Sequence, residues 1–263
     1  ALLTGIAWDH INVFPTFENY VEQFKIFIDS MNESGQLAYF SGDPILNQLA
    51  KEAKLKTISY NTPHYHIRNG KVIVSLSERY ELEIFGEHNL QNAEGARRVC
   101  EMIGIDEKSF YQAMGSFKGT AKRLEKVHES DNLLVFRDFA HSPSKLKATV
   151  EAVRSRFSGD TLIAVFELHT FSSLNKNFLP HYQHAMDSAD HALVYFNPHV
   201  FELKKMEILD SQYIEKSFGD NVEAISDIEK LIEKIRIFRG NVSRGRCVLL
   251  LMSSGNFDNA VLW

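Results

Sequence analysis

Polar residues of the types used in catalysis follow several apolar runs that predict strands in this sequence. The clusters are Asp9-His10, Gly86-Glu87-His88-Asn89, Asp138-Phe139-Ala140-His141-Ser142, Glu167-Leu168-His169-Thr170 and Ser253-Ser254-Gly255-Asn256. A single histidine after a strand is usually a structural residue. In open α/β sheets, however, ligands bind at the carboxyl ends of the strands. We therefore predict that the clusters line one shared cleft.

The spacing Gly86-x-His88-Asn89-x-x-Asn92 places two amides one turn apart at the start of a predicted helix. Neutral donors and acceptors at a helix N-terminus suit a base edge or a phosphate. Plain helix capping by Asn89 explains the same residues equally well. Lys122-Arg123 supply a cationic pair, and the planar guanidinium of an arginine suits a phosphate. An ordinary surface arginine is the competing interpretation.

The elements that must position these residues alternate between strands and helices. Apolar residues from Phe17 to Met31 recur at helical spacing after Thr16, a predicted N-cap. The first half further predicts strands over 1–5, 37–40, 57–60 and 81–85, helices over 43–53, 89–103 and 106–117, and a hairpin over 64–76 around Asn69-Gly70. The second half predicts strands over 133–139, 162–168, 192–196 and 247–252, helices over 142–157 and 178–189, and a helix after the capping box Ser226-x-x-Glu229.

This alternation is typical of a parallel sheet covered by helices. A helical run ends near Phe117, and Gly119 and a basic cluster follow it. We therefore predict an α/β fold in two units, residues 1–117 and 118–263.

Composition excludes several other classes of protein. The chain has 263 residues, 44% hydrophobic and 24% charged, with a formal net charge of −5. This composition argues against disorder, and a slightly acidic chain without basic blocks is not typical of nucleic-acid binding. The longest apolar runs are far shorter than the ~20 residues of a membrane helix. Two cysteines, Cys100 and Cys247, suit a reducing compartment, so we expect a cytoplasmic protein.

The motifs resemble those of the muramate peptide ligases (Mur ligases), in order and spacing, over nearly the whole chain. The matching runs are Thr4-Gly5-Ile6-Ala7-Trp8-Asp9-His10, Gly86-x-His88-Asn89-x-x-Asn92, Phe117-x-Gly119-x-x-Lys122-Arg123-Leu124-Glu125, Arg137-Asp138-Phe139-Ala140-His141-Ser142-Pro143 and Val165-Phe166-Glu167-Leu168-His169. The resemblance implies the later part of a central ATPase domain over 1–117 and a Rossmann-like C-terminal domain over 118–263. It also implies a bacterial ligase of peptidoglycan recycling or synthesis. Such a ligase uses ATP and Mg²⁺ to phosphorylate a carboxylate, and an amine then attacks the acyl phosphate.

The resemblance also implies roles for individual residues. His10 matches a histidine that helps to hold Mg²⁺, and Arg123 matches a basic residue that reaches the phosphates; these are the implied catalytic residues. The residues implied near the nucleotide are His88, Asn89, Asn92, Asp138 and His141. The residues implied to face the incoming amine are His169, Thr170, Ser172, Ser254 and Asn256.

Some motifs look closest to the recycling branch, the murein peptide ligases, which re-attach a salvaged tripeptide to UDP-N-acetylmuramic acid. They are Asp138-Phe139-Ala140-His141-x-Pro143, Phe166-Glu167 and Met252-Ser253-x-Gly255-x-Phe257. The alternatives are an L-alanine-adding ligase, a folylpolyglutamate-type relative and, in another class, a non-catalytic nucleotide- or peptide-binding module.

The chain departs from the family pattern at several positions. Gly5 stands where many members have Asn, and Leu168-His169 replaces Pro-Arg. No arginine follows in Thr170-Phe171-Ser172-Ser173, so the amine substrate stays open. Lys25 lies near the position of a lysine that some members carbamylate, although a solvated helix lysine is the better interpretation.

The sequence begins Ala1-Leu2-Leu3-Thr4, without Met, and contains no G-x-x-x-x-G-K-[ST] phosphate loop. We therefore expect a piece of a longer ligase, unable to turn over ATP alone. A central sheet without its first strands would present an edge open to pairing with a second copy, which predicts a homodimer.

Overall fold

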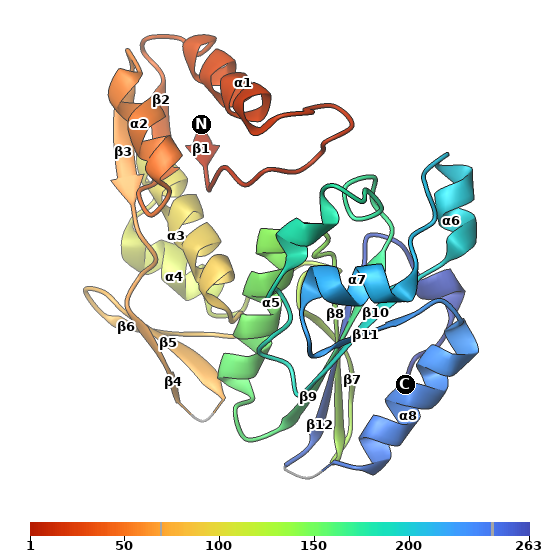
Figure 1. Ribbon diagram of the computed structural model, residues 1–263. Helices are drawn as coiled ribbons and strands as arrows, with labels where there is room; N and C mark the ends of the chain where they lie inside the picture. Colours follow the sequence, from red (N-terminus) through yellow and green to blue (C-terminus); the bar gives the residue numbers. More distant parts are fainter. Residues whose placement is uncertain (69, 243–244) are drawn as a thin grey trace. The chain divides into compact units, whose positions relative to one another are not determined.

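The computed structural model describes residues 1–68, 70–242 and 245–263. It divides into two compact units, Ala1–Lys118 and Gly119–Trp263 (Figure 1). Both units are mixed α/β structures in which parallel strands dominate the main sheet. The predicted fold class is therefore confirmed.

The first unit contains a parallel sheet in the order β1-β2-β3. Its strands are β1 (Leu2–Leu3), β2 (Gln36–Phe40) and β3 (Lys56–Tyr60). The helices α1 (Phe17–Asp29) and α2 (Pro44–Glu52) pack on a core that includes Leu37. Thr16 and Asp43 are their N-caps, since each side chain accepts a backbone N–H of the first turn. The N-cap predicted at Thr16 is therefore confirmed.

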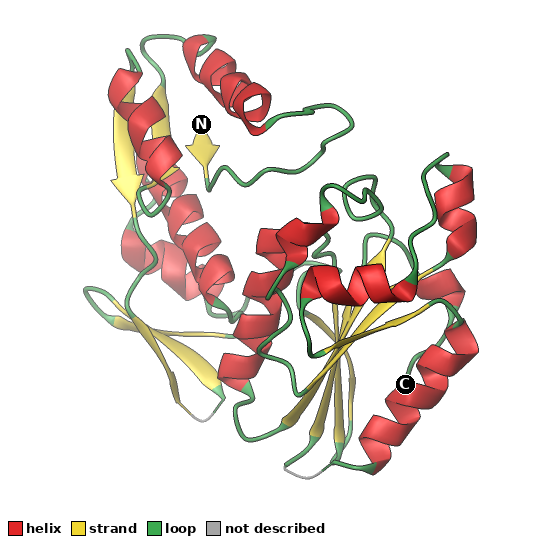
Figure 2. Cartoon of the chain, viewed as in Figure 1, coloured by secondary structure: helices red, strands yellow, loops and turns green. Residues whose placement is uncertain are grey.

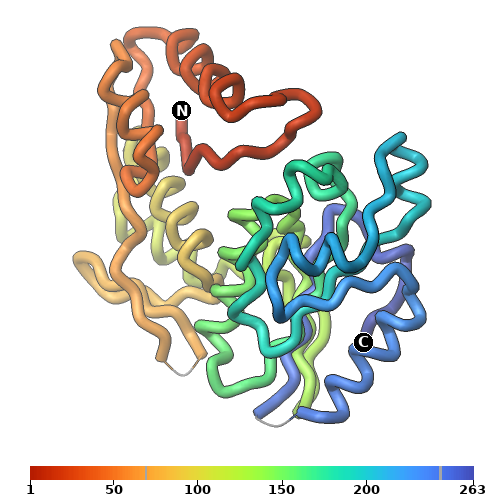
Figure 3. The backbone as a smooth tube through the Cα atoms, viewed as in Figure 1, coloured from red at the N-terminus to blue at the C-terminus, as the bar shows by residue number. Residues whose placement is uncertain are grey.

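After β3 the chain folds back on itself (Figure 3), and this segment forms an antiparallel sheet in the order β4-β5-β6. It consists of β4 (Tyr65–Arg68), β5 (Lys71–Ser75) and β6 (Arg79–Leu82). Arg68 pairs with Lys71, which confirms the predicted hairpin, whereas Asn69 lies outside the described residues. The strand predicted over 81–85 is wrong in extent, because β6 ends at Leu82. Gly86 therefore does not follow a parallel strand. The prediction that every polar cluster follows a strand of a parallel sheet is wrong for the cluster at Gly86-Glu87-His88-Asn89.

The unit closes with α3 (Glu87–Met102) and α4 (Glu107–Met114). α3 contacts all the strands of the parallel sheet. Its buried Glu94 accepts hydrogen bonds from Arg97 at 2.7 and 2.9 Å and from the Tyr111 hydroxyl at 3.0 Å. The bond from Tyr111 joins α4 to α3, and together the bonds supply the partners that a buried carboxylate requires. Burial of its ring raises the pKa of Tyr111, and the neighbouring Glu94 carboxylate raises it further.

The second unit is built on a sheet in the order β11-β10-β9-β12-β8-β7. The strands are β7 (Glu125–Glu129), β8 (Leu133–Asp138), β9 (Thr161–Leu168), β10 (His191–Phe196), β11 (Val222–Ile225) and β12 (Cys247–Met252). β7 is antiparallel to β8, and the other pairs are parallel. β7 was missed because Glu125–Glu129 is polar and lies at an edge of the sheet.

Helices cover both faces of this sheet (Figure 2). α8 (Ile228–Gly240) packs through Leu231 and Ile235 on the face that carries Val135 and Val165. α5 (Pro143–Arg156) contacts β9 and β12, and α7 (Ser211–Phe218) contacts β11. β9 is buried at every position, as its continuous apolar run predicts for a central parallel strand.

Two local predictions in this unit are wrong. The helix predicted over 178–189 is a short 3₁₀ turn, η1 (Leu179–Tyr182), followed by irregular turns in which His184 has a φ of 64°, a value incompatible with a continuous α-helix. Ser226 does not form a capping box. Asp227 is the N-cap instead, and its carboxylate accepts the N–H groups of Glu229 and Lys230. No helix or strand was predicted over 197–225, which contains α6 (Pro198–Leu203), α7 and β11, because each is too short for a clear periodic signal.

Among the described residues, no helix combines the length and the apolar character needed to span a bilayer. The last short element is η2 (Phe257–Asn259), which follows β12. The homodimer stays a prediction.

Candidate functional site

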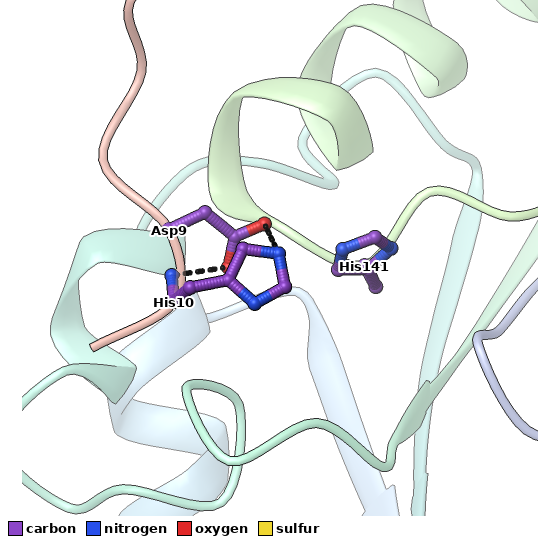
Figure 4. A group of neighbouring side chains, drawn as sticks. All are labelled: Asp9, His10 and His141. Atoms are coloured by element: carbon purple, nitrogen blue, oxygen red, sulfur yellow. Dashed lines mark hydrogen bonds and ion pairs between the residues drawn. The ribbon is translucent and has the colours of Figure 1, made fainter. Parts of the chain in front are cut away.

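The loop after β1 presents Asp9 and His10 in different environments. The Asp9 side chain is 5% exposed and that of His10 is 60% exposed. Asp9 Oδ1 accepts the His10 backbone N–H at 3.1 Å, and Oδ2 lies 3.7 Å from His10 Nε2 (Figure 4). His10 adopts a φ of 72°, and its carbonyl accepts the N–H groups of Val13 and Phe14. A tight turn therefore holds the pair.

This loop is fixed to the helices of the same unit. The Ile6 N–H donates to Asp43 Oδ2 at 2.6 Å, and the Gln91 side-chain amide donates to the Thr4 carbonyl. Gln91 lies on α3, between the predicted nucleotide residues Asn89 and Asn92. The strand-end loop and the start of α3 are thus brought together within the first unit.

The first turn of α3 differs from simple capping by Asn89. Gly86 is the N-cap, with a φ of 89°, and the Asn89 side chain donates to the Phe85 carbonyl at 2.9 Å. His88 and Asn89 are half-buried, whereas Asn92 is exposed. The carbonyl of Asn89's amide and the side chain of Asn92 remain suited to contact a ligand.

In the second unit, the ends of β8, β12 and β9 meet at one edge of the sheet. Met252 pairs with both Asp138 and Phe166, so β8 and β12 end at the same level and β9 continues for two residues, to Leu168. The Ser253 N–H donates to the Asp138 carbonyl at 3.0 Å, and its hydroxyl donates to Glu167 Oε2. For these three strands, the sequence correctly predicted that the polar clusters come together.

Both carboxylate oxygens of Asp138 are used inside this unit. Oδ2 accepts the Leu124 N–H at 2.7 Å, and Oδ1 accepts the Ala140 N–H at 2.7 Å and the Thr149 hydroxyl at 3.4 Å. Asp138 is 3% exposed. Its side chain therefore holds the turn that precedes β7, a role that the sequence did not indicate.

That turn carries Arg123 between two residues in the left-handed region. Lys122 has a φ of 57° and Leu124 a φ of 45°, which costs free energy for residues other than glycine. The Phe139 N–H donates to the Lys122 carbonyl at 2.8 Å, and the Lys122 N–H donates to Glu125 Oε2 at 2.9 Å. These bonds maintain the turn.

Arg123 itself is exposed, and its guanidinium lies 5.6 Å from the centre of the Phe139 ring. The aromatic ring limits the orientations of the side chain while leaving the guanidinium N–H groups available to an anion. His141 lies two residues beyond Phe139, and its Nδ1 is 2.8 Å from the Phe139 carbonyl oxygen. The His141 carbonyl accepts the hydroxyl hydrogen bond of the buried Tyr182.

Glu167 is a buried carboxylate at the end of β9, 3% exposed. Its Oε2 accepts the Ser253 hydroxyl and, at 3.0 Å, the Phe257 N–H. Phe257 and Asp258 both have positive φ values. Glu167 therefore helps to hold the turn that follows β12.

The predicted amine-facing residues lie in the loops after β9 and β12, and among them His169 lies beside Glu167. His169 and Thr170 donate their backbone N–H groups to Ser173 Oγ at 3.1 and 3.0 Å, so Ser173 fixes the loop after β9. Ser172 is buried, and Asn256 is exposed and donates to Asn259 Oδ1 at 2.8 Å.

Ser254 lies in the loop after β12, and Lys204 contacts the loop after β9. Ser254 Oγ is buried and has no hydrogen-bond partner among the described residues. Lys204, on the turn that ends α6, donates to the His169 carbonyl and lies 4.8 Å from the Phe171 ring centre. Partial burial lowers the pKa of Lys204. No sequence pattern indicated Lys204, because Lys204 lies 35 residues from His169, whose carbonyl it contacts.

The Asp9–His10 pair fits a magnesium ion by the chemistry of its donors. Mg²⁺ prefers oxygen ligands and binds through one or two carboxylates, and Asp9 supplies a largely buried carboxylate beside the imidazole. Asp9 is thus the better-suited ligand, although the resemblance implied this role only for His10. Lys25 is exposed on α1.

Comparison with protein families identifies both units. Residues 1–100 match the model of the Mur ligase middle domain, and residues 122–255 match the model of the Mur ligase glutamate ligase domain. The two matches occur in this order along the chain.

Individual relatives agree with these matches. The chain is 28% identical, over 185 residues, to the UDP-N-acetylmuramate–L-alanine ligase of Porphyromonas gingivalis, covering 65% of this chain and 41% of the relative. Among solved structures, it resembles a murein peptide ligase from Psychrobacter arcticus, with a TM-score of 0.61, 18% identity and coverage of 98% and 55%. It also resembles a MurF ligase from Thermotoga maritima in complex with ADP, with a TM-score of 0.70, 18% identity and coverage of 95% and 58%.

At these identities, the solved structures establish the fold alone. The chain spans about half the length of the relatives that it matches, 41% in Porphyromonas gingivalis and 54% in Caldicellulosiruptor bescii. Because the glutamate ligase domain model alone matches residues 122–255, about half of the sequence, the chain belongs to the Mur ligase family.

Proposed function

We propose that this chain forms the later part of the ATP site and the amine site of a peptidoglycan ligase. The ligase would join an amine to the lactyl carboxylate of UDP-N-acetylmuramic acid. ATP would phosphorylate the carboxylate, and the amine would displace phosphate, leaving an amide and ADP. The observation that carries this proposal is the ordered match to both Mur ligase domains.

The residues of the first unit suit the nucleotide and its metal. Asp9 and His10 would hold Mg²⁺, which neutralises phosphate charge when bound. His88, Asn89 and Asn92 would contact the base, because they provide neutral donors and acceptors around the first turn of α3.

In the second unit, Arg123 would bind phosphate oxygens through its exposed guanidinium. Asp138 would act through Arg123 by holding the Leu124 N–H, since both its oxygens already accept hydrogen bonds within the unit. His141 would lie beside the nucleotide. His169, Thr170, Ser172, Ser254 and Asn256 would face the amine.

Two amines are candidates. The motif after β12, with Ser253 and Gly255, favours the tripeptide of the recycling ligases, whereas the curated relatives are named L-alanine ligases. The free thiols of Cys100 and Cys247 agree with the proposal of a cytoplasmic enzyme.

A substrate panel tests the proposal. The complete natural protein that contains residues 1–263 would be incubated with ATP, Mg²⁺, UDP-N-acetylmuramic acid and either L-alanine or L-alanyl-γ-D-glutamyl-meso-diaminopimelate. We expect phosphate release only when carboxylate and amine are both present. Release with the tripeptide alone assigns recycling, and release with L-alanine alone assigns the synthetic reaction. Nucleotide binding without turnover under every condition would favour a binding module.

A further inference from the structure

The loop after β9 places an imidazole opposite a buried carboxylate. His169 Nδ1 lies 4.0 Å from Glu167 Oε1, and the His169 side chain is 36% exposed. Among the residues that the structure describes, this buried Nδ1 has no hydrogen-bond partner. One nitrogen thus faces the carboxylate at the base of the site, while much of the ring remains accessible from outside.

Hydrogen bonds hold the Glu167 carboxylate in this position. Its other oxygen, Oε2, accepts the Ser253 hydroxyl and the Phe257 N–H, so Glu167 cannot rotate without breaking both bonds. The backbone of His169 is held by Ser173 and Lys204. Small movements of the ring would therefore close the remaining gap, as catalytic hydrogen bonds often do when a substrate binds.

Gly255 leaves the space in which the two side chains meet. A Cβ atom at this position would lie 2.8 Å from His169 Nδ1 and 2.9 Å from Glu167 Oε2. Both distances are shorter than ordinary van der Waals contacts. A residue with any side chain would therefore displace the imidazole or the carboxylate.

We propose that His169 accepts a proton from the incoming ammonium group and that Glu167 orients the imidazole for this transfer. This inference rests on the proposed ligase function. An ammonium group has no lone pair and cannot attack an acyl phosphate. Transfer of one N–H proton to His169 Nε2 leaves a neutral amine and an imidazolium ion, which the Glu167 carboxylate stabilises through Nδ1–H.

The neutral amine then forms the C–N bond, and the carbon–oxygen bond to phosphate breaks. Inorganic phosphate leaves with that electron pair, and the nitrogen releases its surplus proton to the departing phosphate or to water. His169 is thus the catalytic residue of the pair and Glu167 its positioning residue.

The test compares two nucleophiles in the complete natural protein that contains residues 1–263. The first is the amine that supports turnover in the substrate panel. The second is hydroxylamine, which is largely neutral at neutral pH and needs no base. The variants are His169→Asn and Glu167→Gln. The control is His199→Asn, which removes an exposed histidine of α6 that is paired at 3.3 Å with Glu202.

We expect His169→Asn to lower kcat with the amine by about 100-fold, the size of a general-base contribution, with little change in KM. Hydroxamate formation should stay within about twofold of wild type, since it bypasses the base. The remaining amide formation should rise with pH, because the neutral amine must then come from solution. Glu167→Gln should show a smaller loss of the same kind, and His199→Asn none.

Equal losses with both nucleophiles would overturn the assignment of the dyad, and so would a change in KM alone. A wild-type protein that forms neither amide nor hydroxamate would contradict the ligase function itself. If only the assignment of the dyad is wrong, the wild type will be active and His169→Asn will keep the wild-type kcat with the amine.

Discussion

Asp138 Oδ2 accepts the Leu124 N–H at 2.7 Å, and this bond ties the end of β8 to the turn that carries Arg123. The contact spans 14 residues of sequence. It fixes a turn whose residues on either side of Arg123 have positive φ values. The buried carboxylate thus determines where the guanidinium is presented.

Asp138→Asn should therefore resemble Arg123→Ala in its effect on turnover. The amide cannot accept both backbone N–H groups, so we expect the free energy of unfolding to fall by about 1–3 kcal/mol. In a double-mutant cycle, the effects on kcat should be strongly non-additive, because both substitutions remove the same arginine contact. Asp131→Asn, at an exposed residue before β8, is the control. Additive effects on kcat would refute the coupling.

Close packing at Gly95 predicts an effect on stability. A Cβ atom there would lie 2.7 Å from the Tyr60 hydroxyl oxygen and 3.0 Å from a Leu2 methyl group. Gly95→Ala should lower the free energy of unfolding by about 1–3 kcal/mol, the usual cost of overpacking. Gly240→Ala is the matched control in α8, since nothing lies within 4 Å of its added methyl group. Denaturant titration of both variants would measure this difference. If Gly95→Ala is as stable as wild type, the close packing of Gly95 against Tyr60 and Leu2 is contradicted.

The Cys247 thiol predicts a dependence of stability on pH. Burial raises its pKa from 9.0 to about 11, so the folded chain holds this proton more tightly than the unfolded chain. The contribution of Cys247 to stability is complete below pH 9 and is lost as the pH rises through about 11.

Two measurements check the behaviour of Cys247. The alkaline fall in the free energy of unfolding should be shallower in Cys247→Ala than in wild type. At mildly alkaline pH, iodoacetamide should modify the half-buried Cys100 well before Cys247. Rapid alkylation of Cys247 in the folded chain would contradict its burial.

The Asp9–His10 pair predicts a dependence on magnesium. His10→Ala should raise the Mg²⁺ concentration that gives half-maximal turnover by about 10-fold, because it removes a group beside the Asp9 carboxylate. Asp9→Asn should have a larger effect, since it removes the charged oxygen ligand. The control is His66→Ala, at an exposed position of β4. Wild-type activity of His10→Ala at limiting Mg²⁺ would exclude the metal role.

Local sequence patterns predicted the long elements well. The stripe from Phe17 in α1, its Thr16 cap and the apolar run of β12 were all recognisable, because each signal lies within one segment. The helix predicted over 178–189 failed because tertiary packing around Tyr182, which lies against Phe166 and Phe218, overrides the apolar spacing.

The sequence identified residues of the candidate site, but it did not indicate which groups they contact in the fold. Asp138 and His169 were found because they follow strands. The Leu124 N–H that Asp138 binds comes from a left-handed turn, and Gly255 lies beside Glu167 in the turn after β12, which is distant in sequence. Such contacts depend on the order of β9, β12 and β8 in the sheet, which local patterns do not specify.

The most direct test of the proposed acyl phosphate chemistry traces a labelled oxygen atom through the reaction. UDP-N-acetylmuramic acid labelled with oxygen-18 in its lactyl carboxylate would be supplied with ATP, Mg²⁺ and the amine to the complete natural protein that contains this chain. An acyl phosphate intermediate predicts that one labelled oxygen appears in the released inorganic phosphate for each amide formed. Phosphate without the label would contradict the proposed ligase chemistry.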